Sequence, residues 1–166
     1  TPLDATTKQK GDLLEQIAAE FLKTQGFEVD QEVRSTASEL DLLCNHKVNK
    51  RVVYVECKAQ RETLSANILT QLLGTIDFHK YQEGWLISTG PLGKDAKGFQ
   101  NTWESQPAKE AQKLSIYTPE RVIDRLIDAK VIKSQPADRA LNLLKSEDLV
   151  GAWTLLLTPF GKFWAL

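Results

Sequence analysis

The stretch from Arg51 to Lys58 constrains the fold of this chain more than any other. Its valines and Tyr54 are typical of a β-strand. Side chains alternate between the two faces of a strand, so Tyr54, Glu56 and Lys58 share one face, opposite the valines and Cys57. A carboxylate and an ammonium group therefore point the same way near the end of an apolar strand, where an unpaired charge is costly.

A second predicted strand, residues 39–44, lies upstream and carries Asp41, and the polar residues 45–50 predict a hairpin turn between the two strands. Folding the hairpin brings Asp41 near Glu56. Two converging carboxylates offer the oxygen ligands that Mg²⁺ prefers, and the Lys58 ammonium can orient or deprotonate water or stabilise charge in a transition state. These residues predict metal-assisted hydrolysis of a phosphodiester.

Structural roles are the alternative for each of these side chains. Asp41 can accept hydrogen bonds from the backbone or from Lys58, and Glu56 and Lys58 can form an ion pair without any metal. Glu39 would face Glu56 if the hairpin register shifted, and the sequence does not fix that register. Cys57 is interpreted as a small buried hydrophobe, and the cysteines and histidines lack the short spacings of a zinc site.

Asp41 followed by Glu56-Cys57-Lys58 resembles the D…ExK signature of the PD-(D/E)xK nuclease superfamily, and residues 10 to 118 resemble its Mrr-like branch of restriction endonucleases. The resemblance implies an α/β fold with a restriction-endonuclease-like core: the order αβββαβ and a central mixed sheet flanked by helices. It implies Mg²⁺ as the cofactor, with Mn²⁺ as a substitute. Asp41, Glu56 and the backbone carbonyl of Cys57 would hold the metal, and Lys58 would help to activate the attacking water.

Three more features carry the resemblance: Glu15 within a helix expected from Gly11 to Gly26, Gln71 on the helix after the motif strand, and the run Gly84 to Gly90. The resemblance implies that Glu15 and Gln71 assist catalysis. The Mrr-like branch usually has Gly two residues before the Asp, where this chain has Glu39, so Glu39 either crowds the site or joins it.

Residues 1–10 are polar and predict a frayed lead-in before the first helix.

The residues alone leave the roles of Glu15 and Gln71 open. The sequence from Asp12 to Glu15 fits a capping box, in which Glu15 would satisfy the start of the helix. Without the resemblance, an exposed polar residue of a helix is the favoured interpretation of Gln71.

The rest of the chain predicts alternating strands and helices. We expect a nuclease domain over residues 1–130, and a C-terminal extension over residues 131–166 that packs on the core or leads to a missing downstream region. The absence of Met and a strand-like end suggest an amino-terminal fragment. The expected elements are strands over Phe27–Val33, Trp85–Thr89 and Leu114–Tyr117, helices over Asn67–Phe78, Lys94–Trp103 and from Pro119, a short helix over Pro136–Leu144, and a hairpin from Val150 to Leu166.

The formal net charge of −1 argues against a generally basic nucleic-acid surface, so contacts to phosphate would be local. The two cysteines give no disulfide framework, and no apolar run is long enough for a membrane span, which favours a cytoplasmic protein without a membrane partner. The candidates for contact with DNA are the basic and polar residues Lys47, Lys50, Arg51, Gln60, Arg61, Ser88, Thr89 and Lys94.

The sequence therefore predicts a Mg²⁺-dependent endodeoxyribonuclease, the N-terminal nuclease domain of a larger restriction or defence protein. An alternative is a catalytically inactive nuclease-fold module for DNA binding or protein docking. A junction-cleaving nuclease of the same superfamily is disfavoured because the chain lacks a broad basic surface. A homodimer, or a downstream domain of the same protein, is left open as a partner.

Overall fold

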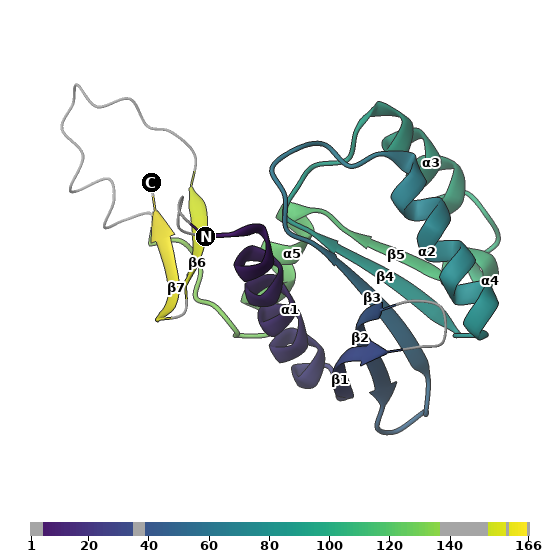
Figure 1. Ribbon diagram of the computed structural model, residues 1–166, viewed down its shortest axis with the longest axis horizontal. Helices are drawn as coiled ribbons and strands as arrows, with labels where there is room; N and C mark the ends of the chain where they lie inside the picture. The colour runs from purple at the N-terminus through teal and green to yellow at the C-terminus, as the bar shows by residue number, and fades with distance from the viewer. Residues whose placement is uncertain (1–4, 35–38, 137–152, 159, 166) are drawn as a thin grey trace.

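The computed structural model describes residues 5–34, 39–136, 153–158 and 160–165. Its centre is a five-stranded mixed sheet in the order β1-β2-β3-β4-β5, in which β1, β2 and β3 are antiparallel neighbours and β3, β4 and β5 run parallel (Figure 1). The strands are β1 (Phe27–Arg34), β2 (Glu39–His46), β3 (Val52–Lys58), β4 (Glu83–Ser88) and β5 (Leu114–Tyr117). The predicted α/β fold with a mixed sheet is confirmed.

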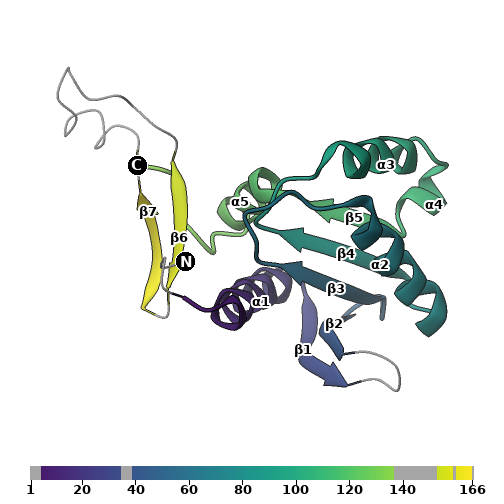
Figure 2. The same cartoon turned by 45° about the horizontal axis from the view of Figure 1, so that its top comes forward.

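Helices cover both faces of this sheet, α1 and α5 on one side and α2, α3 and the short α4 on the other (Figures 1 and 2). The first core cluster, on the α1 side, includes Leu22, Leu42 and Val55, and the second, on the α2 side, includes Leu69 and Leu86. Two layers of helices thus bury both faces of β3 and β4, as parallel strands require. The helices are α1 (Thr7–Thr24), α2 (Ala66–His79), α3 (Lys94–Glu104), α4 (Ala108–Ala111) and α5 (Pro119–Asp128).

Helix α1 begins earlier than predicted. Thr6 is its N-cap: the Thr6 hydroxyl accepts a hydrogen bond from the Gln9 backbone N–H at 3.2 Å, and the Gln9 side chain accepts one from the Thr6 N–H at 2.8 Å. The expected lead-in is therefore wrong from Thr6 onward, and the capping box from Asp12 to Glu15 is wrong; residues 1–4 lie outside the described residues. Glu15 lies in the middle of the helix and cannot cap its start.

A two-stranded hairpin of β6 (Thr154–Thr158) and β7 (Gly161–Ala165) lies beside α1 (Figure 1). Leu155, Leu157 and Trp164 pack against the α1-side core, and Lys162 forms an ion pair with Glu20 of α1. The predicted hairpin is confirmed over these strands, whereas the helix predicted over Pro136–Leu144 falls almost wholly outside the described residues.

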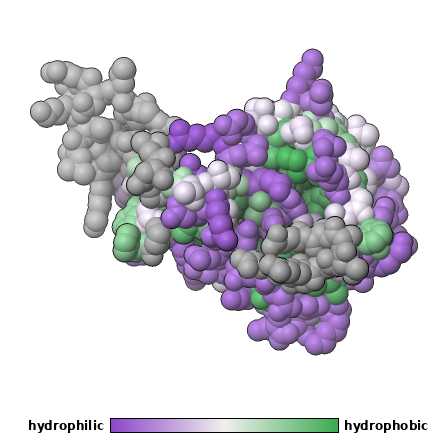
Figure 3. All heavy atoms as spheres, viewed as in Figure 1, coloured by the Kyte–Doolittle hydropathy of each residue, from purple (hydrophilic) through white to green (hydrophobic). Residues whose placement is uncertain are grey.

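The surface seen in Figure 3 is mostly hydrophilic, with hydrophobic residues on the hairpin, where Phe160 and Phe163 are exposed. Among the described residues, no helix combines the length and apolar character needed to cross a membrane.

Candidate active site

The carboxyl end of β3 carries three side chains that contact one another in a line. The Glu56 Oε1 forms an ion pair with the Lys58 Nζ, and the Glu56 Oε2 accepts a hydrogen bond from the Tyr54 hydroxyl. Tyr54 is buried, whereas Glu56 and Lys58 are half-buried. The prediction that these three residues share one face of the strand is confirmed.

Asp41 meets β3 at the point where β2 leaves it. Strands β2 and β3 are paired from Asn45, opposite Val52, to Leu42, opposite Val55. Asp41, the neighbour of Leu42 in β2, lies just outside this pairing. Beyond this point the Asp41 Oδ2 accepts a hydrogen bond from the Cys57 backbone N–H at 2.7 Å. The Asp41 carboxylate thus accepts the Cys57 N–H in place of a backbone carbonyl of β2.

Strand β2 also changes face at Asp41. Leu40 belongs to the α2-side core cluster, whereas Leu42 belongs to the α1-side cluster. Residues two apart in a regular strand point to the same face, so β2 is irregular between these two leucines. The irregularity cannot be predicted from the alternation of apolar and polar residues in the sequence alone.

The Cys57 carbonyl points to the same side as Asp41. The Lys58 carbonyl accepts a hydrogen bond from the Thr89 N–H, which follows β4, at 3.0 Å. Backbone groups of successive residues point in opposite directions along a strand, so the N–H and carbonyl of Cys57 face β2. The Asp41 carboxylate and the Cys57 carbonyl therefore lie on one side of β3, where β2 has diverged.

Negative charge is concentrated around Cys57. Burial raises the pKa of the Cys57 thiol well above its usual value, and the charges of Asp41, Glu15 and Glu56 raise it further. Burial lowers the pKa of Lys58, but the hydrogen bond and charge of Glu56, with a contribution from Asp41, raise it by more. Three carboxylates thus act on one small region, next to the Lys58 ammonium.

Glu15 and Gln71 come from helices on opposite faces of the sheet. Glu15 is half-buried on α1, in the layer that packs on Cys57, and its charge acts on the Cys57 thiol. Gln71 is exposed on α2, and its backbone carbonyl accepts a hydrogen bond from Thr75. The structure gives the Gln71 side chain no hydrogen bond to Asp41, Glu56 or Lys58. Their assistance in catalysis stays a prediction.

The oxygen atoms available at this site suit a hard cation that binds only a few protein groups. Among the residues described, no three His, Cys, Asp or Glu side chains cluster closely enough to hold a metal by themselves. Two carboxylates, Asp41 and Glu56, and the Cys57 carbonyl are nevertheless all oxygen donors, and Mg²⁺ often binds through one or two carboxylates while keeping several waters. The oxygen atoms that Tyr54 and Lys58 contact on Glu56 retain further lone pairs.

Some of the residues predicted to contact DNA lie beside this site. The Thr89 hydroxyl donates to the Gln60 carbonyl at 3.0 Å, which joins the end of β4 to the segment after β3. Thr89 and Arg61 are exposed there. Ser88 is buried, and its hydroxyl donates to the Gly90 carbonyl and accepts from the Gly90 N–H, so it holds the loop rather than facing solvent.

The basic candidates in the turn before β3 lie farther away. Lys47 and Lys50 are in the turn before β3, and Arg51 forms an ion pair with Glu83 at 2.9 Å. This turn is at the opposite end of β3 from Lys58, a distance of about 20 Å along a seven-residue strand. Lys94 is exposed at the first position of α3.

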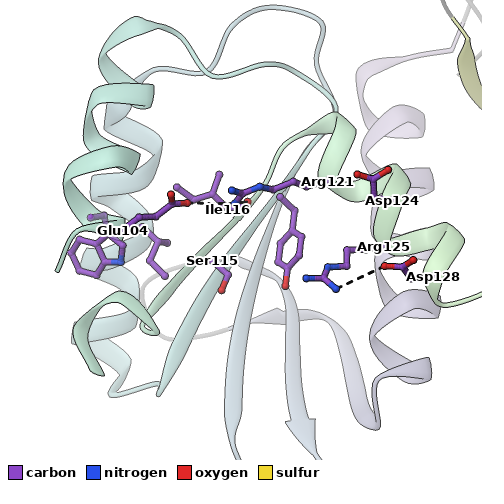
Figure 4. Close-up of a pocket in the computed structure, with 10 residues that line it drawn as sticks. Glu104, Ser115, Ile116, Arg121, Asp124, Arg125 and Asp128 are labelled. Atoms are coloured by element: carbon purple, nitrogen blue, oxygen red, sulfur yellow. Dashed lines mark hydrogen bonds and ion pairs between the residues drawn. The ribbon is translucent and has the colours of Figure 1, made fainter. Parts of the chain in front are cut away.

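A cavity lies elsewhere, along the edge strand β5. It has a volume of about 650 Å³ and lies between α3 and α5 (Figure 4). Arg121 crosses it, contacting Glu104 and the Ile116 carbonyl at 3.4 and 3.3 Å. This cavity contains none of the predicted catalytic residues, and four of its charged side chains form the ion pairs Arg121–Glu104 and Arg125–Asp128.

Sequence reasoning assigned no role to Tyr54, although its hydroxyl contacts Glu56. The signal was available, because a strand residue two positions before Glu56 shares its face.

The sequence matches the Mrr_cat family, described as "Restriction endonuclease", over residues 6–109, which is more than half of the chain. The chain belongs to this restriction endonuclease family. The Mrr-type domain is thus a member of the PD-(D/E)xK nucleases, as the D…ExK residues indicated. No curated protein matches the sequence significantly.

Solved structures are similar to this Mrr-type domain at low sequence identity, and the first of those given below shares its fold. A protein of unknown function, AF1548, is 14% identical, with a TM-score of 0.53 over 79% of this chain and 78% of that chain. A repair endonuclease from Pyrococcus abyssi is 15% identical, with a TM-score of 0.46 over 70% of this chain and 47% of that one. The DNA modification-dependent restriction endonuclease AspBHI is 11% identical, with a TM-score of 0.48 over 77% of this chain and 37% of that one. The Mrr-type domain thus spans less than half of the latter two chains.

Proposed function

We propose that this Mrr-type domain is a Mg²⁺-dependent endodeoxyribonuclease that hydrolyses DNA phosphodiester bonds. One observation carries the proposal: where β2 leaves β3, the Asp41 carboxylate accepts the Cys57 N–H, and the residues on either side of Cys57, Glu56 and Lys58, form an ion pair. The family to which the chain belongs supports DNA as the substrate. We also propose that the domain is the N-terminal part of a longer restriction or defence protein.

In this proposal Asp41, Glu56 and the Cys57 carbonyl hold the metal, with Mn²⁺ as a substitute for Mg²⁺. A divalent cation at this position would polarise the phosphate and lower the pKa of a bound water. The negative charge around Cys57 favours such a cation, because Glu15 and Asp41 add to the field of Glu56 there.

Lys58 acts in this proposal as a cation rather than as a base. Its pKa is raised by Glu56 and Asp41 against the effect of burial, so the amine is protonated at neutral pH. A protonated Lys58 can donate hydrogen bonds that orient the attacking water or stabilise charge on the phosphate. Thr89, Gln60 and Arg61 are placed to contact the DNA backbone next to it.

A second candidate is an inactive module for DNA binding or protein docking. It is favoured by the contacts of Glu56, since both its oxygens have side-chain partners, Lys58 and Tyr54. Asp41 likewise already accepts a backbone hydrogen bond. A purely structural cluster would have no need of a metal, and metal binding therefore separates the two candidates.

The test is cleavage of supercoiled and linear plasmid DNA with Mg²⁺, with Mn²⁺ and with a chelator. We expect metal-dependent cleavage that Lys58→Ala abolishes. The matched control is Asp124→Ala, which removes an exposed charge from α5, away from the site. An intact substrate with either metal, or equal cleavage by Lys58→Ala, would reject the proposed nuclease site.

A further inference from the structure

Tyr54 is placed to act on the site through Glu56. Its side chain is 2% exposed, and its ring lies in the α2-side core beside Tyr81, with ring centroids 6.4 Å apart. A buried phenol hydroxyl needs a hydrogen-bond partner, and this one donates to the Glu56 carboxylate. The ring fixes the position of the hydroxyl, since a packed aromatic side chain has few rotamers.

The Tyr54 hydroxyl is the donor in this contact, because an ionised carboxylate can only accept hydrogen bonds. Glu56 consequently meets a neutral, fixed donor on its Oε2 and a cation, Lys58, on its Oε1.

These two contacts are not equivalent. Lys58 is a long, flexible side chain that is 34% exposed, and in the proposed function it is needed for the substrate. Tyr54 is buried and rigid. When Lys58 turns toward a phosphate, the Tyr54 hydroxyl is the contact that continues to hold the carboxylate.

We propose that Tyr54 is a positioning residue, whose hydroxyl holds the Glu56 carboxylate in the orientation that binds the divalent cation. The inference rests on the proposed function and names a residue outside the D…ExK signature. Hydrogen-bond partners of metal ligands typically change metal affinity or activity by about 10–100-fold when they are removed.

The experiment compares the unaltered chain with Tyr54→Phe, which keeps the ring and removes only the hydroxyl. Mn²⁺ binding is measured by calorimetry without DNA. We expect the dissociation constant to rise by about tenfold or more. In cleavage assays the Mg²⁺ concentration for half-maximal rate should rise, while the rate at saturating Mg²⁺ changes little. Tyr81→Phe is the matched control, since Tyr81 stacks on His79 and has no hydrogen bond to Glu56 in the described structure.

A double-mutant cycle tests whether Tyr54 acts through Glu56. In a Glu56→Gln background, Tyr54→Phe should cause no further loss of Mn²⁺ affinity, because the carboxylate to be positioned is already gone. An equal loss in both backgrounds would overturn the inference. A lower melting temperature for Tyr54→Phe with unchanged Mn²⁺ affinity would also overturn it, because the hydroxyl would then serve only the core.

The failure of this inference is distinct from failure of the proposed function. If the unaltered chain does not bind Mn²⁺, the proposed metal site is rejected and the role of Tyr54 with it. If the unaltered chain binds Mn²⁺ and Tyr54→Phe binds it equally well, only the role of Tyr54 is rejected.

Discussion

Replacing Asp41 separates its structural contact from its proposed role in metal binding. The Asp41 Oδ2 accepts the backbone N–H of Cys57 at 2.7 Å, and Cys57 is only 8% exposed. Asp41→Ala leaves that N–H without its acceptor, which costs about 1–3 kcal/mol. For a chain of this size we therefore expect the melting temperature to fall by roughly 2–12 °C.

Asp41→Asn gives a different combination of effects. The asparagine carbonyl can still accept the Cys57 N–H, so the loss is the difference between a charged and a neutral hydrogen bond, about 1 kcal/mol. Removing a negative charge near Glu56 offsets part of this loss. Both variants should nevertheless lose metal binding and DNA cleavage, since neither offers the Asp41 carboxylate to the cation.

The assay is thermal unfolding of the three proteins with and without Mn²⁺, together with plasmid cleavage. At a Mn²⁺ concentration of 100 times its dissociation constant, the unaltered chain should gain about 2.7 kcal/mol of stability. Neither variant should gain this stability. If Asp41→Asn kept both the Mn²⁺ effect and the cleavage, Asp41 would be a structural residue and the assignment would be refuted.

Three further predictions follow from the structure. Lys58→Met should abolish cleavage but keep Mn²⁺ binding measured by calorimetry, and loss of binding would make Lys58 a part of the metal site. Gly90→Ala would place a methyl group 2.5 Å from the Glu62 carbonyl, so it should destabilise the loop beside the site by about 1–3 kcal/mol in urea unfolding. Burial raises the pKa of Cys44 from 9.0 to about 12, with the charge of Asp30 adding to this. As pH rises above about 9, the thiol ionises in the unfolded chain before the folded one, so the free energy of unfolding should fall, and less steeply in Cys44→Ala.

The face of β3 was predictable from the sequence because alternation is a local property of a strand. It placed Tyr54, Glu56 and Lys58 together before any tertiary contact was known. The Asp41 contact was predictable only in outline. Its detail depends on where β2 leaves β3, and that is decided by the packing of Leu40 and Leu42 into different core clusters.

The start of α1 was missed because its first turn has no apolar residue to reveal a helical period. The local signal was present, however, since Thr6 and Gln9 have the spacing of a capping box. The separation of Lys47 and Lys50 from Lys58 was also foreseeable: residues before and after one strand lie at its opposite ends. By contrast, the contribution of Glu15 at Cys57 arises from the packing of α1 on the sheet, which no local pattern determines.

The proposed nuclease requires that Asp41 and Glu56 share a divalent cation at the end of β3. The most direct measurement is anomalous scattering from crystals of this chain grown with Mn²⁺. We expect an anomalous peak within coordination distance of both carboxylates and the Cys57 carbonyl, with the Tyr54 hydroxyl still on Glu56. No peak at this position in a crystal that holds Mn²⁺, with Glu56 still paired to Lys58, would contradict it.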